Sequence, residues 1–115
     1  MRRIAQVAAL FADAGLVTLV AAISPMRRGR EVARTLVAPG HFLEVHMAAP
    51  VDVCAARDPK GLYRRVREGS LALTGVHPDA PYEAPNAPEL RIEAGTGLKD
   101  ATRAILRAVA GSGLI

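Results

Sequence analysis

Residues 16–23 read Leu16-Val17-Thr18-Leu19-Val20-Ala21-Ala22-Ile23, and Ser24-Pro25 follows at once. A short run of residues that is almost wholly apolar is typical of a β-strand covered on both faces, as in a parallel sheet. Before it, the apolar side chains of residues 4–11 recur at three- and four-residue spacing, which predicts an amphipathic helix that Gly15 would end. A helix followed directly by such a strand predicts an α/β fold.

The remaining chain alternates helices and strands in the same way. Apolar periodicity and the positions of Pro and Gly predict helices over residues 28–37, 50–56, 60–68 and 98–109, and strands over residues 42–47 and 90–92. The apolar stripes of two helices are expected to face the core: Val32, Leu36 and Val37 in the first, and Leu98, Ala101, Ile105 and Val109 in the last. This order is that of a doubly wound α/β sheet. Because three strands make a thin sheet, the sequence looks like part of a larger one.

Residues 70–88 hold four prolines and show little periodicity, so neither a helix nor a strand is expected there. A connection of this length is uncommon in a compact domain and is usually a lid or a binding loop. We therefore expect residues 70–88 to be a lid or substrate loop within one domain that spans residues 1–115.

The amino-acid composition indicates which kinds of binding partner this chain is expected to have. The formal net charge is +4 and the isoelectric point is about 10, which points to an anionic partner. Nucleic-acid binders add aromatic platforms to a basic surface, and aromatic residues make up only 3% of this sequence, so no nucleic-acid partner is expected. Cys54 is the single cysteine, which excludes an intrachain disulfide and favours a reducing, cytoplasmic location. The longest apolar run is too short to cross a membrane, and the histidines show no metal-ligand spacing, so neither a membrane partner nor a metal site is expected.

The segment Ser24-Pro25-Met26-Arg27-Arg28 follows the predicted strand at residues 16–23. In open α/β sheets ligands bind beyond the carboxyl ends of the strands, so this segment is a candidate site. A guanidinium can hold phosphate or sulfate through two parallel hydrogen bonds, and the Ser24 hydroxyl could contact an anion or accept a phosphoryl group. The alternative is that Ser24 caps the next helix and that the arginines are only solvated.

A second candidate segment, Arg57-Asp58-Pro59-Lys60-Gly61-Leu62-Tyr63, follows the strand at residues 42–47 through a short helix. A guanidinium can stack on a purine ring, and Lys60 can hold phosphate oxygens. The alternative is that Asp58 is an N-cap for the next helix, with Pro59 in its first turn.

Several short motifs stand in one order along the chain: Ile23-Ser24-Pro25 with Arg27, then Glu44-Val45, the segment 57–63, Thr74-Gly75, and Pro81-Tyr82-Glu83. In order and spacing they resemble the adenylylsulfate kinase family, and the resemblance spans nearly the whole chain. It implies a P-loop-kinase-like parallel sheet with helices on both faces, incomplete here because the N-terminal strands are missing.

The resemblance also implies an activity, in which the γ-phosphoryl group of ATP is transferred with Mg²⁺ to the 3′-hydroxyl of adenylylsulfate, as in sulfate assimilation. Ser24 would be the catalytic residue, at the position of a phosphoserine intermediate. Arg57 would bind the nucleotide at the ATP adenine. The substrate-binding residues would be Arg27, Lys60, Thr74 and Gly75.

The family's phosphate-binding loop, G-x-x-x-x-G-K-[ST], does not occur in these 115 residues. Phosphoryl transfer depends on backbone amides, a lysine and Mg²⁺ around the phosphates, so the chain alone is expected to be inactive. In the family fold the missing first strand would lie between the strands at residues 16–23 and 42–47. The alternatives are a non-catalytic nucleotide- or anion-binding remnant and a subunit completed in trans by a P-loop-bearing partner, and a homodimer also stays open.

Overall fold

The computed structural model describes residues 1–113 and residue 115. Among these residues it contains five helices and two strands, in the order α1 (Arg2–Asp13), α2 (Arg27–Arg34), β1 (Val45–Ala48), α3 (Val51–Arg57), α4 (Leu62–Arg67), β2 (Leu90–Glu93) and α5 (Leu98–Gly111). Each predicted helix is present within a few residues of its expected ends. Residues 70–88 form neither a helix nor a strand, as the prolines predict. The α/β class is confirmed.

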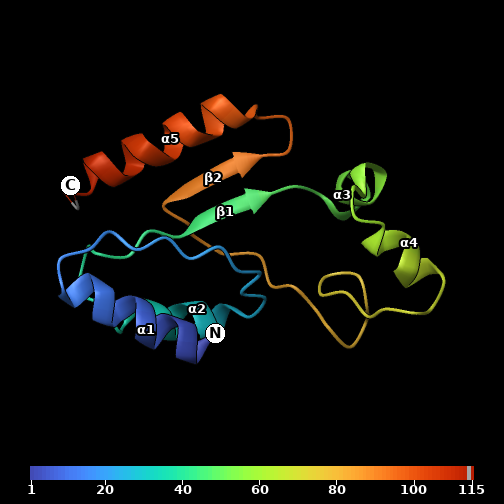
Figure 1. Cartoon of the computed structure of the whole chain (residues 1–115), viewed down its shortest axis with the longest axis horizontal. Helices are drawn as coiled ribbons and strands as arrows, with labels where there is room; N and C mark the ends of the chain where they lie inside the picture. Colours follow the sequence, from blue (N-terminus) through green and yellow to red (C-terminus); the bar gives the residue numbers. More distant parts are fainter. Residues whose placement is uncertain (114) are drawn as a thin grey trace.

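The two strands form a parallel pair, in which Val45 lies opposite Leu90 and Ala48 opposite Glu93. Parallel strands need a long connection between them, and α3, α4 and the loop 70–88 supply it. Helix α5 packs on β2 and α1 packs on α2. Figure 1 shows α5 on one side of the strands and α1 with α2 on the other, so the sheet is flanked by helices.

The predicted strand at residues 16–23 is not formed. In Figure 1 this segment runs as an extended trace between α1 and the two strands. No backbone hydrogen bond in the described part of the chain involves residues 17–23, and Leu19 is 81% exposed. A strand exists only where a neighbour pairs with its backbone, and here the sequence pattern of a buried strand has no pairing partner. The prediction of three strands is therefore wrong, and the sheet that the described residues form has two.

The core is small and consists mostly of alanine. The buried apolar residues among those described are Ala5, Ala9, Ala33, Ala48, Ile92 and Ala101. Ala101 was correctly predicted to face inward, but Val32 and Leu36 are exposed and Leu98 is 84% exposed. Helix α2 ends at Arg34, so the helical periodicity does not reach Leu36, and Leu98 is the first residue of α5.

Helix α1 and the extended segment beside it enclose an apolar groove of about 310 Å³. Its lining includes Ile4, Val7 and Phe11 from α1 and Val20 from the segment, and each of these side chains is exposed. The apolar stripe predicted for α1 therefore lines an open groove instead of a filled core. Among the described residues, no helix has the length and apolar character that a bilayer span requires.

Candidate functional site

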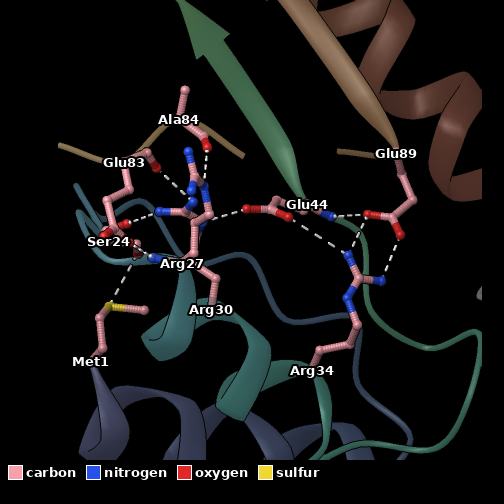
Figure 2. A network of polar contacts seen from close by, with 9 residues as sticks. All are labelled: Met1, Ser24, Arg27, Arg30, Arg34, Glu44, Glu83, Ala84 and Glu89. Atoms are coloured by element: carbon pink, nitrogen blue, oxygen red, sulfur yellow. Dashed lines mark hydrogen bonds and ion pairs between the residues drawn. The ribbon is translucent and has the colours of Figure 1, made fainter. Parts of the chain in front are cut away.

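The Ser24 turn, residues 24–28, joins the extended segment to α2 (Figure 2). Ser24 has a φ of +44°, a left-handed conformation that costs a non-glycine residue roughly 1–3 kcal/mol and persists only where the surroundings enforce it. Its hydroxyl donates to the Met1 sulfur at 3.1 Å. The N-cap of α2 is Met26, and Ser24 makes no capping hydrogen bond, so the alternative that Ser24 caps this helix is wrong.

The end of the loop 70–88 is fastened to this turn. The Glu83 backbone N–H donates to the Pro25 carbonyl at 2.8 Å, and the Glu83 carboxylate accepts from the Arg27 backbone N–H at 2.7 Å. The Arg27 Nε donates to the Ala84 carbonyl at 2.8 Å. The Glu83 carboxylate thus serves the first N–H of α2, where the helix dipole favours a negative charge. Two segments far apart in the sequence form one polar unit.

Arg30 lies beneath this unit and is only 8% exposed. Its Nη1 donates to the Ser24 carbonyl at 2.6 Å and its Nη2 to the Glu83 carbonyl at 2.7 Å, while Nε forms an ion pair of 2.5 Å with the Glu44 carboxylate. The sequence interpretation did not single out Arg30. The signal that could have found it is the spacing of Arg27, Arg30 and Arg34, which places three guanidiniums on one face of α2.

The ion-pair network continues from Glu44 to Glu89. Arg34 holds Glu89 through two hydrogen bonds of 2.5 and 2.9 Å, and the same carboxylate accepts from the Glu44 backbone N–H at 2.7 Å. The hydrogen bonds from Arg34 lower the pKa of Glu89 below its ordinary value, although partial burial opposes them, and the same pair raises the pKa of Arg34. Arg34 also lies 4.7 Å from the centre of the Phe42 ring. This network ties α2 to the starts of both strands.

The lowered pKa of Glu89 predicts an acid dependence of stability. In the folded chain Glu89 binds its proton less readily than in the unfolded chain, so its contribution is complete above about pH 4.5 and is lost as pH falls through the folded-state pKa. We expect the urea midpoint of the wild type to fall below about pH 4.5 and the Glu89→Gln variant to show a flatter profile, with the two profiles converging at low pH. Urea unfolding monitored by circular dichroism from pH 6 to pH 3 measures both. An unchanged slope in Glu89→Gln would contradict the assigned role of the Arg34–Glu89 pair.

The second candidate segment lies elsewhere, where α3 ends and α4 begins. The Arg57 Nη2 donates to the Ala94 carbonyl at 2.6 Å, and Lys60 is exposed in the turn between the two helices. The Asp58 carboxylate accepts from the backbone N–H groups of Tyr63 and Arg64 at 3.2 and 3.0 Å, so it satisfies donors in the first turn of α4. The N-cap itself is Gly61 and Pro59 precedes the helix, so the predicted N-cap position of Asp58 is wrong. Desolvation raises the pKa of Asp58, but these backbone donors outweigh it and the net shift is downward.

Thr74 and Gly75 lie in the loop 70–88. Gly75 has a φ of +81°, and its N–H donates to the Ala80 carbonyl at 2.7 Å, which closes a turn of the loop on itself. A Cβ at this position would lie 3.3 Å from that of Tyr82, so a glycine suits both the conformation and the space. The end of this loop is thus bonded to the turn that carries Ser24 and Arg27, whereas Arg57 ends α3 and Lys60 lies in the turn between α3 and α4, at one end of the molecule (Figure 1).

His46 and Tyr82 pack beside the Arg30 guanidinium. The two rings stack with centroids 6.2 Å apart, and Arg30 lies 5.9 Å from the centre of the Tyr82 ring. Burial, with the charges of Arg91 and Arg30, lowers the pKa of His46, so at neutral pH the imidazole is uncharged. Within the part of the chain that the structure describes, no group of three His, Cys, Asp or Glu side chains is placed to hold a metal ion.

These observations define an α/β protein with a parallel sheet and a turn at the start of α2 in which serine and arginine side chains gather. Comparison with known sequences then gives the family. The sequence model of the adenylylsulphate kinase family matches residues 1–93, and this chain belongs to that family.

Individual relatives agree. The adenylyl-sulfate kinase of Geotalea uraniireducens (strain Rf4) is 47% identical over 111 residues, which are 95% of this chain and 52% of that protein. The probable adenylyl-sulfate kinase of Bacillus subtilis (strain 168) is 43% identical over 100% of this chain and 58% of its own length. The solved structure of the Mycobacterium tuberculosis APS kinase CysC in complex with AMPPNP and APS matches with a TM-score of 0.85 and 34% identity, over 95% of this chain and 64% of that one. The chain thus spans about half the length of these curated relatives.

Proposed function

We propose that this chain forms the adenylylsulfate-binding side of an adenylylsulfate kinase and that it does not transfer phosphate by itself. The observation that carries the proposal is the fixed Ser24 turn. Arg27 is held by its backbone N–H and its Nε, and its two terminal nitrogens make no hydrogen bond or ion pair within the described residues, so they are available to an anion. The M. tuberculosis relative was solved with APS and AMPPNP, which supports an anionic nucleotide as the ligand.

In the reaction that we propose, the 3′-hydroxyl oxygen of adenylylsulfate attacks the γ-phosphorus of ATP, the bond from that phosphorus to the β-γ bridging oxygen breaks to release ADP, and the hydroxyl proton passes to solvent. Arg27 would hold the phosphosulfate group through two parallel hydrogen bonds. The Ser24 hydroxyl, now bonded only to a thioether sulfur, a weak acceptor, would be the group nearest to the transferred phosphoryl. Arg57 would contact ATP, and Lys60, Thr74 and Gly75 would contact the substrate.

These 115 residues do not supply the groups that would bind the phosphates of ATP in this reaction. They contain no G-x-x-x-x-G-K-[ST] loop. The described residues also contain no cluster of carboxylates that could bind Mg²⁺. The carboxylates of Glu44, Glu83 and Glu89 are each bonded to an arginine or a backbone N–H. The described residues thus offer Mg²⁺ no set of ligands of their own.

A second candidate, favoured by the apolar groove, is a subunit completed in trans by a P-loop-bearing chain. The groove and the unpaired backbone of residues 17–23 lie side by side, and an added apolar strand would pair with that backbone and cover Leu19 and Val20. A non-catalytic binding remnant would keep the arginine contacts without this partner. Mixing this chain with a P-loop-bearing half of a relative separates the two, because only the first gains activity.

The proposed roles of the two arginines predict different ligand losses. We expect Arg27→Ala to weaken adenylylsulfate binding about 10- to 100-fold, because a charge-assisted hydrogen bond contributes about 1.5–3 kcal/mol, and to leave ATP binding unchanged. Arg57→Ala should instead weaken ATP binding and leave adenylylsulfate binding unchanged. Isothermal titration of both nucleotides into the purified chain measures this.

Arg103→Ala is the matched control, since this arginine is exposed on α5 and pairs only with Asp100. It should bind both nucleotides as the wild type does. Equal loss of both ligands in Arg27→Ala, or no loss, would refute the assignment of adenylylsulfate to the Ser24 turn.

A further inference from the structure

Arg30 makes three polar contacts with three different segments. Nη1 holds the Ser24 carbonyl of the turn, Nη2 holds the Glu83 carbonyl at the end of the loop 70–88, and Nε pairs with Glu44 just before β1 (Figure 2). Each guanidinium nitrogen is thus committed to a protein acceptor. Because the side chain is also buried, Arg30 has neither the access nor a remaining nitrogen to meet a ligand.

One acceptor of this guanidinium lies where the backbone is strained. Ser24 has the positive φ, and its own carbonyl is the one that Arg30 holds. The next carbonyl, that of Pro25, is held by the Glu83 N–H, and Glu83 is in turn held by Arg30 through its carbonyl. Two consecutive carbonyls of the turn are therefore fixed, one directly and one through Glu83.

Arg27 depends on the same arrangement. Its backbone N–H donates to the Glu83 carboxylate and its Nε to the Ala84 carbonyl. If residues 83 and 84 moved, the direction of the Arg27 side chain would change with them. The two arginines thus have different roles. The terminal nitrogens of Arg27 can bind a ligand, and Arg30 holds the backbone that sets the direction of the Arg27 side chain.

We propose that Arg30 is a positioning residue, which locks the Ser24 turn onto the end of the loop 70–88 and so sets the direction of the Ser24 hydroxyl and the Arg27 guanidinium toward the substrate anion. The functional part of this proposal rests on the proposed function. The planar fork is required, because the single ammonium of a lysine cannot reach two carbonyls and a carboxylate in fixed directions.

Hydrogen exchange of single amides in the full chain tests the lock without any ligand. The Arg27 and Glu83 amides report on it, since both bonds join the turn to the loop. We expect Arg30→Ala to speed the exchange of both at least about tenfold and to leave the amides of α5 at their wild-type rates. Arg34→Ala is the matched control: it removes contacts to Glu44 and Glu89 but none to the turn, so both amides should keep their rates. Unchanged exchange in Arg30→Ala, or equal acceleration in Arg34→Ala, overturns the proposal.

If the amides of α5 also lose protection from exchange in Arg30→Ala, the Arg30→Lys variant provides the test instead. It keeps a positive charge beside Glu44 and lacks the fork, so the two amides should still exchange at least about tenfold faster, and wild-type rates would overturn the proposal.

Titration of the nucleotides then tests the functional part of the proposal. Arg30→Lys should weaken adenylylsulfate binding about tenfold with ATP binding unchanged, a difference between the two ligands that general destabilisation would not produce. A wild-type chain that binds no adenylylsulfate would refute the proposed function, while the exchange rates would still decide whether Arg30 locks the turn.

Discussion

Joining this chain to the part of the G. uraniireducens relative that it does not match is expected to raise phosphoryl transfer to adenylylsulfate at least about a thousandfold over the chain alone. Phosphoryl transfer needs backbone amides, a lysine and a bound metal around the phosphates, and a single preorganised donor at a developing charge is often worth about 10²–10³ in rate. The unmatched part of that relative, nearly half its length, is where we expect the phosphate-binding loop. Transfer of labelled γ-phosphate to adenylylsulfate measures the gain.

Two controls make this result specific. A fused chain in which the lysine of the added G-K-[ST] motif is replaced by Ala should return to the rate of the chain alone, because the phosphates lose their main cation. A fused chain with Arg103→Ala should keep the full gain. A fused chain that folds and shows no gain would mean that the Ser24 turn does not serve this reaction.

Glu44→Ala is expected to destabilise the chain by about 2–3 kcal/mol, the largest loss that we expect from a single polar substitution. Removing one partner of a buried ion pair leaves the other charge uncompensated, which typically costs about 3–5 kcal/mol. The side chains of Arg30 and Glu44 are 10% and 16% exposed, and Arg30 keeps its two carbonyl acceptors, so we expect the lower end of that range or less. Urea unfolding at pH 7 measures the difference in the free energy of unfolding.

Glu68→Ala provides the comparison for Glu44→Ala. Glu68 pairs with Arg64 at 3.9 Å, and both side chains are more than half exposed. Exposed pairs of this kind contribute about 0.3–0.5 kcal/mol. If both variants lost the same small amount, the pair of Arg30 and Glu44 would not hold α2 to the start of β1.

The helices and the paired strands could be predicted from the sequence because their signals are local. Helix α5 follows Gly97 with a long apolar periodicity, and the prolines of residues 70–88 exclude regular structure there. The end of the apolar run also follows from the sequence, because Ser24-Pro25 interrupts it before α2.

Two features could not be predicted in this way. The pattern of residues 16–23 is that of a buried strand, but a strand also needs a neighbour that pairs with it, and no single segment encodes its neighbour. Arg30 was missed because burial of an arginine depends on acceptors from distant segments, here the Ser24, Glu44 and Glu83 positions. Sequence periodicity shows which face of α2 Arg30 occupies but not what meets it there.

The most direct test of the central claim is transfer of labelled γ-phosphate from ATP and Mg²⁺ to adenylylsulfate by the purified 115-residue chain, with Ser24→Ala beside it and circular dichroism on the same samples. We predict helical spectra for both proteins and no transfer above background in either, because these residues supply the substrate side of the reaction without the phosphate-binding loop. Turnover well above background that Ser24→Ala reduces would contradict the account, since it would show that these residues transfer phosphate without that loop.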